Sequence, residues 1–415
     1  MSLAEGVSAR IAYKPYATGE ITPGVEPDIT VDPGADGGQI LRRVSSSLTL
    51  NKDTYQSNEI RSDRQIADFR HGVKRPQGNI SGELSPLTYG DFFQAACRGT
   101  WAVGVSLTES ALTSVAADNA TSKFTFGGGD PIALGLRVGH VVRFTDATSN
   151  DGENFVILGF GGTGNREVTV YPAPETQAAD TAFTVTSAGK RLIVPSSGFV
   201  SRKFAIEIWN QDVDVARVFT ECRCGGFNVQ LPPTGLGTVD FDFMGRNMKP
   251  FSGVDAPFFT SPAAETTTGL VASVNGLLRV SGETVAVVTG LNIQMQLNPS
   301  ADPVIGSDLV PEIFLGRANV TGQMTAFFEN VDLINDFVNE SEIEILAYLT
   351  TNNALNAPAL TFYLPRVKLG GADLQTQGEG GQAITLPYQA LKSTAVEAST
   401  GIPSTTIQII DTEMV

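Results

Sequence analysis

The chain has 415 residues, of which 41% are hydrophobic, and it contains 43 glycines and 22 prolines. This composition indicates a globular chain, and the glycine and proline content together with many Thr and Val residues favours a turn-rich β protein. The net charge of −16, from 44 acidic and 28 basic residues, argues against a protein that grips nucleic acid, but not against one that lets nucleic acid pass.

The cysteines and histidines predict neither a disulfide framework nor a metal site. The three cysteines are Cys97, Cys222 and Cys224, and the only histidines are His71 and His140. Cys222 and Cys224 could supply half of a metal site but have no second pair of ligands, so two buried strand cysteines are the better interpretation. We predict no cofactor, and folding in a reducing compartment. The N-terminus shows no secretory signal pattern and no run of about 18 apolar residues occurs, so no transmembrane helix is expected.

The first part of the chain predicts an arm, a strand and a long loop. Residues 1–37 are rich in proline and glycine, which predicts an extended arm. From Ser45 to Asn51, Leu48 and Leu50 alternate with polar residues, as in a half-buried strand. Residues 52–76 predict a long charged loop, and loops of this length inside a compact domain are usually functional. Its mixed charges favour a protein partner.

A short segment occurs twice in the chain. Asn79–Ser85 reads Asn-Ile-Ser-Gly-Glu-Leu-Ser, and Asn319–Thr325 reads Asn-Val-Thr-Gly-Gln-Met-Thr, with the same polarity at each position. Further matching residues on either side of the repeat lie 245 positions apart in the sequence. Ile206–Ile208, however, matches Ile343–Ile345, which lies only 137 positions later. The first copy of a duplicated domain therefore holds 108 additional residues.

Each copy predicts a short helix after the repeated segment. In the first copy Thr88 is the expected N-cap of an aromatic helix ending at Arg98, and in the second copy a helix is expected over 330–338. These features predict the following domains: an arm at 1–37, a first domain at 38–98 and 204–256, an inserted small β domain at 99–203, a linker at 257–267, a second domain at 268–390 and a tail at 391–415.

The insertion contains a motif that suggests dinucleotide binding. Gly159–Gly164 matches G-x-G-x-x-G, between predicted strands at Phe155–Leu158 and Glu167–Tyr171. A dinucleotide fingerprint must open a helix, whereas here the following residues alternate as in a strand. We therefore predict a hairpin turn, with a further strand at Val141–Thr145.

The order of these elements resembles a known family. A strand, a long charged loop, the Asn-Ile-Ser-Gly strand and the aromatic helix, followed by Phe219–Arg223 and the strand that ends in Phe241–Gly245, resemble the tail tube proteins of long-tailed bacteriophages (siphophages). The resemblance covers both copies, about 300 residues. It implies a mainly β fold of two tandem β-sandwich domains, each with a short flanking helix. It also implies that these domains close with those of other chains into a 24-stranded β-barrel ring.

The resemblance further implies a structural virion protein without enzymatic activity. Two domains per chain imply homotrimeric rings with pseudo-sixfold symmetry, stacked into the tail tube that conducts DNA during ejection. The implied partners are further copies of the chain, the tape-measure, tail-terminator and tail-tip proteins, and double-stranded DNA only in passage, with no membrane anchoring. The chain would fold in the host cytoplasm and end in the virion. The stacking role would fall to charged residues of the long loop: Glu59, Arg61, Asp63, Arg64, Asp68 and Arg70.

The strands of both copies carry one apolar face and one face of mostly uncharged amides and hydroxyls. We predict that this polar face lines a lumen, made acidic by three carboxylates, so that DNA phosphates are not bound and the DNA slides. Arg366 and Lys368 fit this prediction only if they face outward. The alternative is an ordinary solvated sheet face. The predicted lumen residues are Thr49, Asn51, Asn79, Ser81, Glu83, Asn228, Gln230, Asp240, Asp242, Asn292, Gln294, Gln296, Asn319, Thr321, Gln323 and Thr325.

Other classes of protein fit the sequence less well. An outer-membrane barrel would need a signal sequence and an apolar outer band. A glycan hydrolase would need paired carboxylates, and none stands out in the sequence. The main alternative is a β-sandwich adhesin or carbohydrate-binding protein of a virion or cell surface, which would be monomeric and would respond to sugars.

Overall fold

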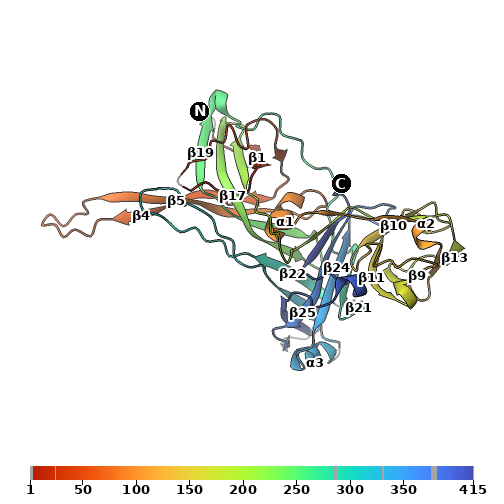
Figure 1. Cartoon of the computed structure of the whole chain (residues 1–415). Coiled ribbons are helices and arrows are strands. Elements are labelled where there is room, and N and C mark those ends of the chain that lie inside the picture. The colour runs from red at the N-terminus through yellow and green to blue at the C-terminus, as the bar shows by residue number, and fades with distance from the viewer. Residues whose placement is uncertain (1–2, 24, 285–287, 330, 375–380, 415) are drawn as a thin grey trace.

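The computed structural model describes residues 3–23, 25–284, 288–329, 331–374 and 381–414. These residues form a mainly antiparallel β protein with one 20-stranded sheet and one separate eight-stranded sheet. Figure 1 shows the arrangement of these strands. The predicted mainly β class is therefore confirmed.

One layer of the large sheet runs without a break through both halves of the chain. In this continuous layer, neighbouring strands are hydrogen-bonded in the order β3 and β4, β5, β18, β17, β22, β23, β27, β25. The bounds are β3 (Ser45–Ser46), β4 (Thr49–Gln56), β5 (Phe69–Glu83), β18 (Thr238–Met244), β17 (Val215–Leu231), β22 (Val288–Gln296), β23 (Asn319–Phe327), β27 (Ala383–Ala390) and β25 (Ala359–Leu369).

A flanking layer covers the apolar side of each half. The first flanking layer is formed by β1 (Ala9–Pro15), β16 (Phe204–Asn210), the start of β17 and β19 (Asn247–Ser252). The second is formed by β20 (Gly276–Val280), β24 (Ile343–Thr350), the start of β25 and β28 (Gln408–Asp411). The long strands β17 and β25 bend from a flanking layer into the continuous layer. The two halves therefore have the same order of elements, each a sandwich around one shared apolar core.

The two terminal segments differ from the predicted arms. β1 lies within residues 1–37, where it pairs with β16 along its whole length, and its Ile11 and Tyr13 are buried. β28 lies within residues 391–415 and pairs with β25 and with β15 (Lys190–Ile193). Each belongs to a flanking layer and pairs with strands on both of its sides, since β1 also pairs with β2 (Gln39–Ile40). The prolines and glycines around them hid their short alternation, and their partners lie far away in the sequence.

The segment predicted as a linker, 257–267, is also packed. Phe258 and Phe259 are buried against Tyr16 and Val218, beneath the first flanking layer. Backbone hydrogen bonds join Thr260 to Ala35 and hold the linker beside the N-terminal segment.

The two helices that follow the repeated segments differ in burial. α1 (Gly90–Cys97) lies between the layers of the first half, and six of its eight residues are buried. Thr88 is not its N-cap, because the hydroxyl of Thr88 is hydrogen-bonded to those of Ser85 and Thr266. α3 (Asp332–Val338) has no buried residue. Asn330, the predicted first residue of this helix, lies outside the described residues.

The insertion forms the separate sheet between α1 and β16. Its strands run from β7 (Ser106–Thr108) to β14 (Thr184–Ser187), whereas β6 (Ala102–Val103) pairs with β15 in the large sheet. The others are β8 (Val115–Asp118), β9 (Lys123–Phe126), β10 (Val141–Thr145), β11 (Phe155–Gly161), β12 (Glu167–Tyr171) and β13 (Gln177–Asp180). β11 and β12 are antiparallel neighbours, so the predicted hairpin turn at 159–164 is confirmed.

The eight-stranded sheet of the insertion packs on the second half of the chain, although its sequence is inserted in the first. Val141 and Val156 of the insertion belong to one apolar cluster with Leu346 and Tyr363 of the second flanking layer. Arg137 forms an ion pair with Glu397, at 2.8 Å between Nε and Oε1, in the short helix α4 (Glu397–Thr400). The insertion therefore ties the two halves together.

The prediction of a long irregular loop at 52–76 is wrong. β4 and β5 pair from Thr49–Gln77 to Gln56–Phe69, and only residues 57–68 form the tip. The resulting hairpin projects far from the body (Figure 1). Its two faces are both exposed and polar, so the one-sided apolar alternation that reveals a strand is missing. Of the strand predicted at Ser45–Asn51, Leu48 is buried and Leu50 only half-buried.

Three short strands complete the large sheet: β2 (Gln39–Ile40), β21 (Glu283–Thr284) and β26 (Asp373–Leu374). The remaining short helices are α2 (Glu109–Leu112) and η2 (Thr163–Asn165) in the insertion, and η1 (Gly6–Ser8) and η3 (Gly253–Asp255) beside the first flanking layer.

Candidate functional site

The polar residues of the two halves share one face of the continuous layer. Residues directly opposite each other on paired strands point to the same side of a sheet. One such row passes from Ser81 through Asp240, Asn228 and Gln294 to Thr321, across five strands. The residues between them, such as Ile80 and Phe227, are buried on the opposite side. The polar residues that alternate with apolar ones along each strand therefore form one continuous surface across both halves.

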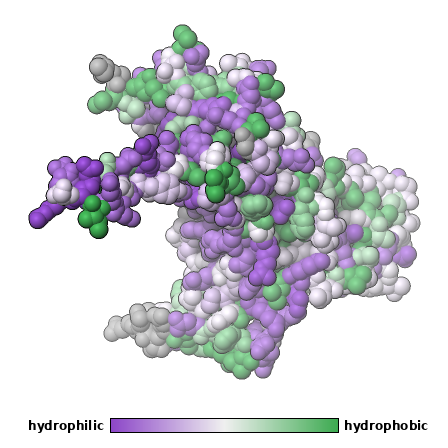
Figure 2. All heavy atoms as spheres, turned by 60° about the vertical axis from the view of Figure 1, so that its left-hand side comes forward, coloured by the Kyte–Doolittle hydropathy of each residue, from purple (hydrophilic) through white to green (hydrophobic). Residues whose placement is uncertain are grey.

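All sixteen residues singled out from the sequence belong to this polar face by register. Thr49 and Asn51 lie at its margin, opposite Gln77 and Arg75 at the base of the hairpin. Sequence reasoning missed Ser45 and Gln389, which continue the row of Ser81 and Thr321 together with Lys368. Figure 2 shows hydrophilic side chains on the surface between the hairpin and the lower end of the molecule.

The charges on the polar face are mainly acidic. Asp240 and Asp242 lie on β18, and burial together with the charge of Asp240 raises the pKa of Asp242. The hydroxyl of Ser81 donates a hydrogen bond to Asp240. Lys368 lies opposite Gln389 and therefore belongs to the polar face by register, so the condition that it faces away from this face is not met. Its charge is paired, because Nζ lies 3.6 Å from Oε2 of Glu340.

The continuous layer has an unpaired edge in each half. β3 and β4 pair only with β5 among the described strands, so their other side is open. In the second half, Lys368, Leu369 and β26 pair with β27 on one side and with no other described strand. Between the halves no edge remains, because Gly226–Leu231 of β17 pairs with Leu291–Gln296 of β22. The molecule is therefore a section of sheet with two open ends.

The tip of the hairpin carries the charged residues predicted for stacking. Their charges largely satisfy one another: Arg61 lies 3.2 Å from Asp63 and Arg70 lies 2.8 Å from Asp68. These partners hold the pKa values of both aspartates below their ordinary value. Next to Arg61, Ile60 is 98% exposed, although it is apolar. A projecting tip that exposes apolar side chains indicates a contact surface.

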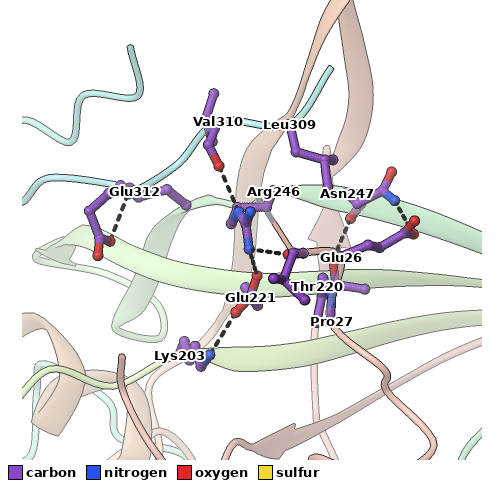
Figure 3. A network of polar contacts seen from close by, with 12 residues as sticks. Glu26, Pro27, Lys203, Thr220, Glu221, Arg246, Asn247, Leu309, Val310 and Glu312 are labelled. Atoms are coloured by element: carbon purple, nitrogen blue, oxygen red, sulfur yellow. Dashed lines mark hydrogen bonds and ion pairs between the residues drawn. The ribbon is translucent and has the colours of Figure 1, made fainter. Parts of the chain in front are cut away.

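A buried ion network supports the base of this hairpin, as Figure 3 shows. Glu221 of β17 accepts a hydrogen bond from Lys203, at 2.6 Å, and one from Arg246. Arg246 is fully buried and also donates to the backbone carbonyl of Val310 at 2.7 Å. Neighbouring Arg223 forms an ion pair with Glu312 at 3.0 Å. The network joins the first half to the segment 299–317 of the second.

The segment 299–317 is the counterpart of the hairpin in the second half, but it does not project. Lys74 of β5 forms an ion pair with Asp308, at 2.7 Å, and its backbone N–H donates to the Asp308 carbonyl. Val310 and Ile313 are buried against Val73. This second loop is therefore folded along the base of the first hairpin, and of the two corresponding loops only the first projects.

The described residues contain no group of three or more His, Cys, Asp or Glu side chains that could hold a metal ion. All three cysteines are buried and free, as predicted for Cys222 and Cys224. None of the helices in the described ranges is both long and apolar enough to cross a membrane.

Comparison with known proteins identifies the family. Residues 6–390 match the family described as phage tail tube protein, which covers nearly the whole chain from β1 to the end of β27. No curated protein matches the chain.

Proposed function

Because the chain belongs to the phage tail tube protein family, we propose that three copies close into a ring and that the rings stack into the tail tube, the conduit for DNA ejection. The observation that carries this proposal is the joint between β17 and β22, which continues one sheet from the first half into the second. A joint of this kind can be repeated between chains, since each chain presents one open edge from each half.

The number of strands and the cost of open edges support the proposed ring closure. The continuous layer has eight strand positions in the described residues, with β3 and β4 sharing one. Three chains would therefore supply 24 positions around a pseudo-sixfold ring. An exposed strand edge invites uncontrolled association, and a closed ring pairs every edge with a partner. The edge at β25 and β26 would pair with β3 and β4 of the next chain.

The polar face would line the lumen of this ring. Its amides, hydroxyls and carboxylates offer no cluster of unpaired positive charge to the DNA backbone. Binding of phosphates by Lys and Arg releases counterions and would hold the DNA in place. A neutral to acidic lining lets DNA move through the tube.

The projecting hairpin would join one ring to the next. Because the second loop is folded along the hairpin base, each ring would present three hairpins and not six. Stacking would then have threefold symmetry even though the ring is pseudo-sixfold. The tape-measure, tail-terminator and tail-tip proteins are the further partners in this proposal, with folding in the host cytoplasm before assembly.

Negative-stain electron microscopy of the concentrated, purified protein tests the proposal. Hollow rings or tubes whose axial class averages show threefold symmetry with six lobes are expected. Tubes with another symmetry would contradict the trimeric ring. Monomers that gain melting temperature on addition of sugars would favour the alternative, a carbohydrate-binding sandwich.

A further inference from the structure

The helix of the second half, α3, lies at the open end of the molecule and exposes apolar side chains. Val338 is 68% exposed and Phe337 is 36% exposed, whereas the corresponding helix of the first half is almost fully buried. The strand that precedes it adds Phe327 and Phe328, which are 50% and 37% exposed. α3 lies at the lower end of the molecule in Figure 1. Apolar side chains gathered at one end in this way indicate a contact that a single chain does not complete.

The joint between the two halves shows what covers the corresponding helix. On α1, the ring of Phe93 lies 6.0 Å from that of Phe362 in the second flanking layer. The backbone N–H of Leu87, just before α1, donates to Asp411 of β28 at 2.6 Å. The helix of the first half is thus covered in part by the flanking layer of the following half.

Counterparts of these residues can be identified for the contact between chains. Asp91-Phe92 corresponds to Asp336-Phe337 in the repeat, so Val338 takes the place of Phe93. Phe362 lies on β25 between β24 and β28. The corresponding place in the first half is on β17 between β16 and β19.

The face of β17 at that place is incompletely covered. Val215 and Arg217 point to the same side as the buried Phe219, by alternation along β17. Val215 is 36% exposed, and Arg217 is half-buried and has no ion-pair partner among the described residues. An apolar and a basic side chain suit a helix whose sequence, Asp-Leu-Ile-Asn-Asp-Phe-Val, is both apolar and acidic.

We propose that α3, with Phe327 and Phe328, docks on the first flanking layer of a neighbouring chain, at Val215 and Arg217. This inference rests on the proposed ring and names the second contact that closes it, outside the lumen and separate from the strand edges. The occupant of the α3 surface is a second copy of this chain. Within one chain the contact is impossible, because α3 and β19, which flanks the start of β17, lie at opposite ends of the molecule (Figure 1).

Cross-linking tests the contact directly. In the variant Val338→Cys with Val215→Cys, a short bismaleimide should link neighbouring chains and give covalent dimers and trimers, but no larger species, on a denaturing gel. The native thiols do not interfere, because all three are buried and burial raises their pKa values. The matched control replaces Val338→Cys by Val396→Cys, since Val396 is 65% exposed but lies beside the insertion.

The outcomes separate this contact from the proposed function. Rings or tubes in the microscope without cross-linking of the 338–215 pair would overturn the α3 contact and leave the tube function standing. A protein that neither assembles nor cross-links would contradict both. A second variant uses assembly alone: Val338→Asp should abolish rings, whereas Val396→Asp should form them as the unaltered chain does. Normal rings of Val338→Asp would also overturn the contact.

Discussion

The hydroxyl of Tyr89 passes directly beneath Gly82 and donates a hydrogen bond to the backbone carbonyl of Arg42 at 2.9 Å. The same arrangement occurs in the second half, where Tyr388 lies beneath Gly322 and donates to the carbonyl of Asn292 at 2.7 Å. The two tyrosines come from different elements, but both cross a strand at the glycine of the repeated segment. Both copies therefore have glycine at this position because a tyrosine ring fills the space that any larger side chain would need there.

A methyl group at this glycine should destabilise the fold. A Cβ at position 82 would lie 1.8 Å from Oη of Tyr89, so Gly82→Ala must displace the ring or the strand. Overpacking of this kind costs about 1–3 kcal/mol in the free energy of unfolding. Thermal and urea unfolding would measure the loss. Gly159→Ala is the control, because no atom lies within 4 Å of its Cβ position, and equal losses for both variants would contradict the explanation.

Loss of Arg246 should loosen the second loop as well as reduce stability. Arg246→Met leaves Glu221 paired only with Lys203 and leaves the Val310 carbonyl without its donor. Breaking a buried ion pair by removal of one partner costs about 3–5 kcal/mol. Hydrogen exchange at residues 308–313 should become faster.

Arg70→Met supplies the control for this network. Arg70 is exposed and pairs only with Asp68, so its replacement should leave the melting temperature unchanged. Unchanged exchange at 308–313 in Arg246→Met would show that the network does not hold the second loop.

Shortening the hairpin should separate ring formation from stacking. Replacement of residues 57–68 by a two-residue Asn-Gly turn joins Gln56 to Phe69, which are already paired, with a turn suited to a hairpin. The variant should fold with an unchanged melting temperature and form rings but not long tubes. Tubes of normal length in electron micrographs would exclude the tip from stacking.

A single exposed residue on each loop tests whether only one hairpin per chain stacks. Ile60→Asp on the hairpin tip should shorten the tubes, because an apolar contact between rings would be replaced by a charge. Ile305→Asp should not, although Ile305 is equally exposed, since it lies on the folded second loop. Equal effects of the two variants would favour sixfold stacking.

Asp411 should make stability depend on pH near neutrality. Burial raises the pKa of its carboxyl from 3.8 to about 7, although it accepts a hydrogen bond from the N–H of Leu87. Between these pH values the folded state keeps a proton that the unfolded chain has released, so the contribution of Asp411 to stability falls as pH rises from about 4 to about 7. Asp411→Asn should therefore melt at a higher temperature than the unaltered chain at pH 7.5, and this advantage should vanish near pH 4. A variant that is less stable at pH 7.5 would contradict the sign.

The sequence by itself determined features that depend on neighbouring residues. The alternation of Asn228 and Gln230 with buried Val229, or of Gln294 with Met295, fixed the two faces of each strand, because side chains alternate with a period of two. The repeated segment indicated the duplication, and the strand-like residues after Gly159–Gly164 indicated a hairpin. The alternation and the hairpin are each visible within a few residues, and the duplication is visible from the comparison of two such short segments.

Only the tertiary structure decided which strands become partners. β1 and β28 were missed because their partners are not their neighbours in the sequence: β1 pairs with β16, and β28 pairs with β15 and β25. Short strands gain their stability from pairing and not from local preference. The hairpin and the second loop have similar places in the repeat, yet one projects and the other is held by Arg246 and Lys74. The contacts of the second loop with this network decide its conformation, whatever conformation its own sequence would favour. The same holds for α1 and α3: both follow a repeated segment, but within one chain only α1 is covered by a second layer of strands.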